Sequence, residues 1–256
     1  MTDWIHRLPT PLMGLVVLAA TFLVTEVIYR TVMGLATGER GRDFKAVSPG
    51  LFPPLGIIFG LLVAFLASQA WGDVDRAHAT VNREASALRT VVLLSQALPA
   101  SSGDQLRGAI RRHIEEAQTT EWPAMAEGRA TLKMIPVALA EALQATLAMT
   151  PEGAGQVAAQ REIAVALETA ADARRQRILI SQAHVNWIKW MSLFVQAVCT
   201  LVAVAMVHSD NRRSARFALG LYATAMAVCI FLIVAHDRPF NGPNSVTPAP
   251  LLQVEP

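Results

Sequence analysis

Hydrophobic residues dominate four long segments of the chain, 11–33, 51–71, 185–207 and 217–235, which together contain only three charged side chains. About 20 consecutive apolar residues are enough for a helix to cross the hydrocarbon core of a bilayer. The first segment is longer than the apolar region of a signal peptide, which is about 15 residues, so we expect it to be retained. The pattern predicts four transmembrane helices arranged as two hairpins.

The stretch between the hairpins is more polar, and its apolar residues recur at three- and four-residue steps, which is typical of packed helices. Pro99 predicts the end of one helix, and Ser102 with Gln105 has the spacing of a capping box that opens a second helix. Trp122–Pro123 is expected to end that helix. A third helix is predicted over 136–149, and Thr150–Pro151 is expected to open a fourth.

These patterns predict an all-α integral membrane protein with four transmembrane helices and a helical insert between helices 2 and 3. The expected domains are the first transmembrane hairpin (1–72), a helical extramembrane domain (73–184), the second transmembrane hairpin (185–236) and a C-terminal tail (237–256).

The composition agrees with a membrane protein, since 53% of the residues are hydrophobic and only 16% are charged. The net charge of +2 gives no reason to expect a nucleic-acid partner. Cys199 and Cys229 lie in apolar segments, so we interpret them as small buried hydrophobic residues. The numbers of Lys and Arg do not decide how the chain is oriented in the membrane, because seven lie near the spans on one side of the bilayer and eight on the other.

No enzyme motif is present, so we expect neither catalysis nor a cofactor. His113 and Glu116 have the i, i+3 spacing of metal ligands, but a di-iron bundle needs this pair from two helices together with further glutamates. We therefore expect no metal and interpret these two residues as part of a solvated helix face. Glu26 is the one carboxylate within a span; we interpret it as an i, i+4 partner of Arg30, and Lys189 as an interfacial anchor.

The second span separates small from bulky residues around the helix. Gly56 and Gly60 have the spacing that lets another helix approach closely, which favours a role in helix packing. Beside them, Ile57, Leu61 and Phe65 form a stripe that faces lipid, another helix or a narrow water path.

Three stretches resemble the bestrophin family of ion channels in their bacterial form, and more closely the uncharacterised bacterial proteins with a bestrophin-like domain. The first comprises Leu55–Ile57 through Phe65–Ala67, followed by Asp75–Arg76 and Asn82–Glu84; the others are Asp237–Gly242 and Glu121–Met125.

The resemblance implies a bestrophin-like fold in the bacterial inner membrane, with the termini and the insert in the cytoplasm. It also implies a homo-oligomer, a pentamer, whose second helices ring a pore for inorganic ions. The hydrophobic neck is then formed by Ile57, Leu61 and Phe65, or, in an alternative register, by Gly60, Ala64 and Ser68. Calcium gating is not carried over, because the acidic run after the last span is absent.

Elementary geometry favours assembly, because a four-helix chain leaves no water path between its own helices. Five helices spaced about 10 Å apart leave an opening of radius about 3.5 Å, whereas four leave about 2 Å. We expect Pro53–Pro54 to open the second span, so that its positive dipole end and the basic residues Arg40, Arg42 and Lys45 attract anions at one mouth. The alternative functions are a membrane sensor or scaffold with a four-helix interaction domain and, third, a transporter that uses Glu26.

Overall fold

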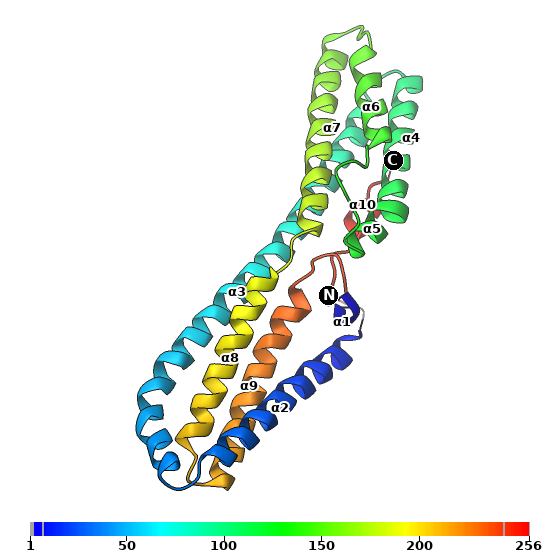
Figure 1. The fold of residues 1–256 in the computed structure, drawn as a ribbon. Coiled ribbons are helices and arrows are strands. Elements are labelled where there is room, and N and C mark those ends of the chain that lie inside the picture. The colour runs from blue at the N-terminus through cyan, green and yellow to red at the C-terminus, as the bar shows by residue number, and fades with distance from the viewer. Residues whose placement is uncertain (1–2, 7, 243, 256) are drawn as a thin grey trace. The chain divides into compact units, whose positions relative to one another are not determined.

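The structure is a computed structural model that describes residues 3–6, 8–242 and 244–255 (Figure 1). Every regular element in this part of the chain is a helix, and four helices are long and apolar enough to cross a membrane. The predicted all-α fold with four transmembrane helices is confirmed. The chain divides into two compact units: unit 1 comprises 1–72 and 184–238, and unit 2 comprises 73–183 and 239–256.

The helices follow one another along the chain, and the longest connections are those between α5 and α6 and between α9 and α10. Their bounds are α1 (Asp3–His6), α2 (Thr10–Leu35), α3 (Glu39–Ser95), α4 (Ala100–Glu116), the π-helix η1 (Ala117–Glu121), α5 (Trp122–Ala126), α6 (Val137–Ala148), α7 (Ala154–Ser181), α8 (Trp187–Val207), α9 (Arg212–His236) and α10 (Ala249–Leu252).

Unit 1 contains the apolar helices α2, α8 and α9 and the first half of α3 (Figure 1). α2 packs against both α9 and α8, and α8 packs against α9. The buried side chains between them are mostly aliphatic, such as Val32, Leu193, Leu201 and Leu219. Large apolar side chains also cover the outer surface of this unit, as expected for helices surrounded by lipid.

The second span does not begin at Pro53–Pro54, and that prediction was wrong. α3 begins at Glu39, after Gly38 turns the chain with a φ of 60°. Pro49, Pro53 and Pro54 therefore lie inside the helix, where each removes one backbone donor from the helical ladder. A proline fits a first helical turn and is tolerated inside membrane helices, so the sequence pattern alone did not separate the two cases.

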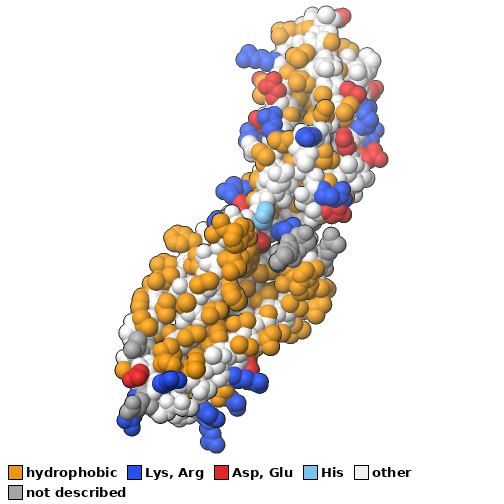
Figure 2. All heavy atoms as spheres, viewed as in Figure 1, with side chains coloured by type: hydrophobic (Ala, Val, Ile, Leu, Met, Phe, Trp, Pro, Cys, Tyr) orange, Lys and Arg blue, Asp and Glu red, His pale blue; other side chains and the backbone are white. Residues whose placement is uncertain are grey.

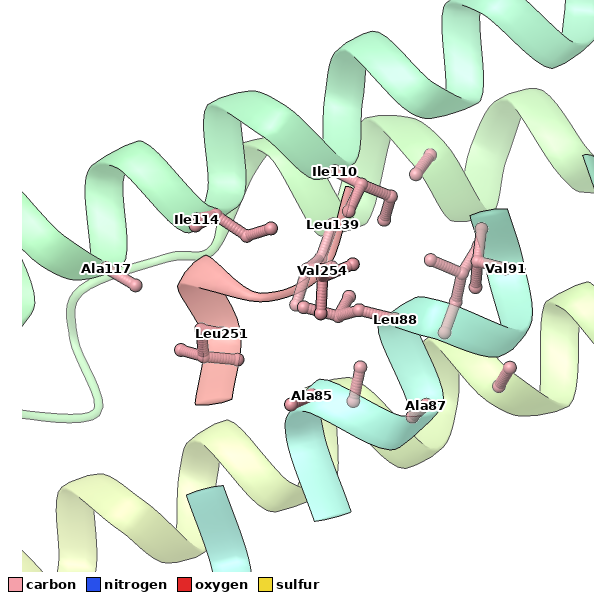
Figure 3. Close-up of a cluster of buried hydrophobic side chains, with 14 of the residues drawn as sticks. Ala85, Ala87, Leu88, Val91, Ile110, Ile114, Ala117, Leu139, Leu251 and Val254 are labelled. Atoms are coloured by element: carbon pink, nitrogen blue, oxygen red, sulfur yellow. The ribbon is translucent and has the colours of Figure 1, made fainter. Parts of the chain in front are cut away.

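Unit 2 is a bundle of the second half of α3 with α4, α6 and α7, closed by the residues that follow the last span. Its core contains Leu88 and Val91 of α3 and Ile110 of α4 (Figure 3). Leu251 and Val254, from the end of the chain, lie among them. The segment expected as a tail is thus part of the core of unit 2.

The helix boundaries of unit 2 differ in places from those expected. α3 ends at Ser95, before Pro99 as expected, but α4 already begins at Ala100, so Ser102 does not cap it. Even an alanine does not fit at Gly103 without a shift of the backbone, because a Cβ there would lie 2.7 Å from the carbonyl oxygen of Ser95.

Two further breaks lie elsewhere than expected. Trp122–Pro123 does not end the second helix of the insert, because the π-helix η1 continues directly into α5 and the chain turns only at Gly128 (φ 68°). α7 begins at Ala154 rather than at Pro151, and Gln182 to Asn186 separate it from α8. A proline permits a helix break but does not require one at its own position.

Candidate functional site

The membrane part of α3 has one buried face and one open face. Phe59, Leu66 and Ala70 are buried inside unit 1. Ile57, Leu61 and Ser68 lie about 160–200° around the helix from Phe59, since each residue advances by about 100°. Ile57, Leu61 and Ser68 are all exposed, so this face of α3 is open within the part of the chain that the structure describes.

Contacts with α8 and α9 determine which face of α3 is open. Gln196 of α8 donates a hydrogen bond from Nε2 to the carbonyl oxygen of Leu55 (2.9 Å), and Lys189 of α8 donates to Oε1 of Gln69. On the neighbouring side, the ring of Phe59 packs against Tyr222 of α9 at 6.5 Å between centroids. Interhelical hydrogen bonds of this kind fix the rotation of a helix inside a membrane.

Both expected neck registers lie on the open face. Ile57, Leu61 and Phe65 are 63%, 54% and 72% exposed within the single chain. Gly60, Ala64 and Ser68, which form the alternative register, are exposed as well. The structure of one chain does not separate the registers, and both remain predictions.

Gly56 and Gly60 of α3 pack against no other helix in the described part of this chain. A Cβ built on Gly56 or Gly60 would meet no atom within 4 Å. Close packing at this pair requires a helix from a second copy, and the packing role stays a prediction.

The basic residues expected at the pore mouth lie at the start of α3. Arg40 and Arg42 are exposed in its first turn, whereas the side chain of Lys45 lies outside the described part of the chain. Because the helix begins at Glu39, its free N–H groups lie beside these arginines and not at Pro53–Pro54. The positive end of the helix dipole therefore lies at Glu39 and not at Pro53–Pro54, where we expected it.

The charged side chains within the apolar segments, Glu26, Arg30 and Lys189, all have polar partners. Arg30 donates from Nε to Oε1 of Glu26 (2.7 Å), which confirms the i, i+4 pair. Lys189, which we interpreted as an interfacial anchor, bonds to Gln69 of α3 and so also joins two helices. Cys199 is exposed and Cys229 is half-buried, so the interpretation of both as buried residues was wrong; side chains that face lipid need not be buried in protein.

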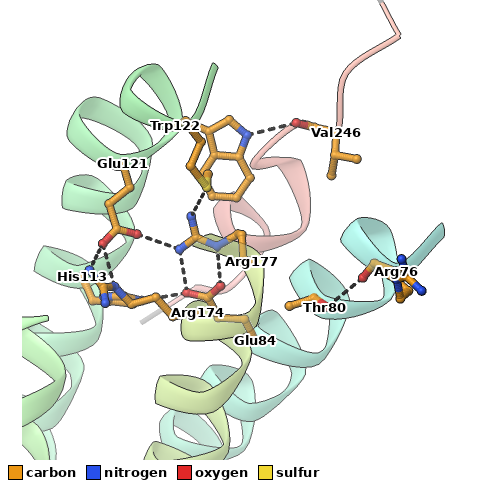
Figure 4. Close-up of polar contacts among 10 residues, drawn as sticks. Arg76, Thr80, Glu84, His113, Glu121, Trp122, Arg174, Arg177 and Val246 are labelled. Carbon is orange, nitrogen blue, oxygen red and sulfur yellow. Dashed lines mark hydrogen bonds and ion pairs between the residues drawn. The ribbon is translucent and has the colours of Figure 1, made fainter. Parts of the chain in front are cut away.

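A buried network of charged side chains lies in unit 2 (Figure 4). Arg177 of α7 donates from Nε to Oε2 of Glu84 of α3 (2.8 Å) and from Nη2 to Oε2 of Glu121 of η1 (2.8 Å). Arg174 donates from Nε to Oε1 of Glu121 (2.6 Å) and from Nη2 to the carbonyl oxygen of Met134 (2.7 Å). The network ties α3, η1 and α7 to one another.

His113 belongs to this network and not to a solvated face, so that interpretation was wrong. Its Nε2 lies 2.9 Å from Oε1 of Glu84, and only 1% of the residue is exposed. Among the described residues, no group of three or more His, Cys, Asp or Glu side chains has the arrangement of a metal site. The i, i+3 spacing to Glu116 was misleading, because the partner of His113 lies 29 positions away on another helix.

In the network, two arginines face two carboxylates. Burial alone lowers the pKa of Arg177, but attraction to Glu84 and Glu121 and the hydrogen bonds to both carboxylates outweigh it, and the pKa lies above its usual value. Arg177 therefore stays charged throughout the physiological range.

Trp122 joins this network to the end of the chain. The guanidinium of Arg177 lies over its ring, 4.4 Å from the centroid, and Trp122 Nε1 donates to the carbonyl oxygen of Val246 (3.0 Å). Phe240 packs edge-on against the same ring. The sequence analysis named Glu121 and Trp122 as part of a family motif but assigned them no role. The sequence around them, a glutamate and a tryptophan before a proline, does not indicate that they join a buried network.

A family model named Bestrophin-like domain matches residues 16–251 of this chain. The chain belongs to the bestrophin-like domain family. The match includes α2 from residue 16 onward, the other three apolar helices and the whole of the insert, so the predicted resemblance is confirmed. In the comparisons with curated proteins and with solved structures, nothing matches. The chain is thus a multi-pass membrane protein of the bestrophin-like domain family.

Proposed function

We propose that several copies of this chain assemble into an anion-permeable ion channel whose α3 helices surround a central axis. The observation that carries the proposal is the open face of α3, where the bulky residues Ile57, Leu61 and Phe65 point away from unit 1. Of the four spans, α3 has the smallest buried share within the chain, which supports a further protein partner on its free side.

In the proposed assembly, the stripe of Ile57, Leu61 and Phe65 forms a hydrophobic neck. Rings of apolar side chains gate water and ions by dewetting, so the neck needs no charged residue. Gly56 and Gly60 then lie where the α3 helix of a neighbouring copy approaches. A ring of five leaves an opening of radius about 3.5 Å, wide enough for an inorganic ion.

The proposed preference for anions rests on the first turn of α3. Arg40 and Arg42 are exposed there, next to the free N–H groups of the first helical turn. Positive charge at a pore mouth raises the local concentration of anions. We further propose that the protein resides in the bacterial inner membrane with the insert and both termini in the cytoplasm; an even number of spans supports both termini being on one side.

Current recordings from the purified full chain in planar bilayers, under a tenfold KCl gradient, test this proposal. We expect currents that reverse close to the chloride equilibrium potential. Replacing Arg40, Arg42 and Lys45 together by Gln shifts the reversal potential toward zero, whereas Arg161→Gln, an exposed arginine of α7, leaves it unchanged. An assembly that conducts no ions contradicts the proposal and favours the sensor or scaffold function.

A further inference from the structure

A groove in unit 1 lies between α2 and α9, at the end where the α2–α3 and α8–α9 turns lie. Its volume is about 220 Å³, and Phe22, Thr25, Tyr29, Leu219 and Gly220 line it together with the charged residues Glu26 and Arg216. One part of the lining is apolar and the other carries charge. This combination matches an amphiphile better than an ion or a purely apolar chain.

Gly220 keeps the apolar part of the groove open. A Cβ on this glycine would meet no atom within 4 Å, so the floor of the groove is empty at this point. Phe22 and Leu219 flank it, and both lie in helices that cross the membrane. Because the surroundings of these helices are lipid, the molecule available to fill such a groove is an acyl chain.

The charged part of the groove is formed by the first turns of α9. The guanidinium of Arg216 lies over the ring of Tyr29, 5.0 Å from the centroid. Arg212 and Arg213 precede Arg216 by four and three residues, so the three side chains share one face of α9, one turn before Gly220. All three are exposed.

The single carboxylate in the groove does not cancel this positive charge. Glu26 is engaged by Arg30, which brings its own positive charge to the same helix end. Figure 2 shows Lys and Arg side chains gathered at this end of unit 1, next to its hydrophobic surface. Arginine forms strong charge-assisted hydrogen bonds with phosphate, so such a cluster suits the head group of an anionic lipid.

We propose that this groove is a binding site for an anionic phospholipid. The phosphate lies against Arg216, with Arg212 and Arg213 around it, and one acyl chain follows the groove past Gly220. The residues that line the groove belong to α2 and α9 and not to α3, and the proposed binding does not depend on ion conduction.

Native mass spectrometry of the full chain, released from nanodiscs with equal amounts of phosphatidylglycerol and phosphatidylcholine, tests the proposal. The wild-type chain retains phosphatidylglycerol in preference to phosphatidylcholine. Because each basic residue near a membrane surface contributes about 1 kcal/mol toward anionic lipid, Arg216→Gln lowers this preference about fivefold. Arg161→Gln, an exposed arginine of unit 2, leaves it unchanged.

A second variant tests the apolar part. Gly220→Leu fills the groove and also lowers the retention of phosphatidylglycerol. Gly34→Leu, in α2, does not lower it, although a Cβ at Gly34 also meets no atom within 4 Å. Free glycerol phosphate, which carries the head-group charge without acyl chains, does not displace the lipid. Equal retention of both lipids, equal losses in the control variants, or displacement by glycerol phosphate would each overturn the proposal.

Discussion

The side chains of Glu84 and Arg177, 93 positions apart in the sequence, face each other with no solvent exposure, Nε lying 2.8 Å from Oε2 and Nη2 3.1 Å from Oε1. Glu84 lies on the same helix, α3, that crosses the membrane, and Arg177 lies on α7. The pair therefore fixes the part of α3 outside the membrane within the bundle of unit 2. Breaking a buried pair leaves one charge without compensation, which is far more costly than losing an exposed pair.

Replacing Arg177 by Met is expected to lower the free energy of unfolding of unit 2 by about 3–5 kcal/mol, because Glu84 and Glu121 lose their shared partner. Trp122 is the one tryptophan of unit 2 and lies against Arg177. In a chain whose other four tryptophans are replaced by Phe, its fluorescence reports the unfolding of unit 2 in a urea titration of the solubilised protein. Arg175→Met is the matched control, since this neighbouring arginine is exposed and pairs with Asp172 at 3.2 Å. Equal losses in both variants would show that the network does not stabilise the unit.

The end of the chain offers a closely matched pair of leucines. Leu251 is completely buried in the core of unit 2, whereas its neighbour Leu252 is 48% exposed. Leu251→Ala is expected to lower the free energy of unfolding by about 2–5 kcal/mol, because it leaves a cavity. Leu252→Ala changes it by no more than about 0.5 kcal/mol. The same urea titration measures both, and a stable Leu251→Ala variant would mean that the end of the chain does not belong to the core.

The hydrogen bond from Gln196 to the backbone of α3 makes a testable contribution to the membrane unit. Gln196→Leu is expected to lower the midpoint of thermal unfolding, since an interhelical hydrogen bond within a membrane contributes about 0.6–1.7 kcal/mol. Ser192→Ala is the control on the same helix, because the hydroxyl of Ser192 bonds only within α8, to the carbonyl oxygen of Ile188. An unchanged midpoint for Gln196→Leu would show that this hydrogen bond does not stabilise the packing of α3 against α8.

The two neck registers make opposite predictions for single substitutions. If Ile57, Leu61 and Phe65 line the neck, Leu61→Ser wets the constriction and increases the single-channel conductance severalfold, while Ala64→Leu has little effect. If Gly60, Ala64 and Ser68 line it, Ala64→Leu reduces conductance and Leu61→Ser has little effect. Leu23→Ser, at a leucine of α2 that is 69% exposed, is the control for a polar residue facing lipid.

The four spans and the helical character of the insert follow from local information in the sequence. Twenty apolar residues or a three-to-four residue period are properties of one segment, and each segment retains them in the folded chain. The sequence also separated the bulky residues Ile57, Leu61 and Phe65 from the small residues of α3, but it left open whether they face lipid, another helix or a water path.

The buried network could not be predicted, because its partners are brought together only by the packing of the bundle. Nothing around His113 distinguishes it from the exposed residues beside it; its environment depends on Glu84 of another helix. The start of α3 was also missed, because three prolines resemble a helix boundary even where the helix continues through them. The role of the last residues depends on Trp122 and the bundle core, neither of which is near in sequence.

The most direct test of the channel proposal is to image the purified full chain by single-particle electron microscopy and average the views along the membrane axis. We expect a ring of five copies with α3 nearest the centre and a continuous gap bordered by Leu61 or Ala64. A monomeric particle, or a ring in which the open face of α3 is closed against other helices without a central gap, would contradict it.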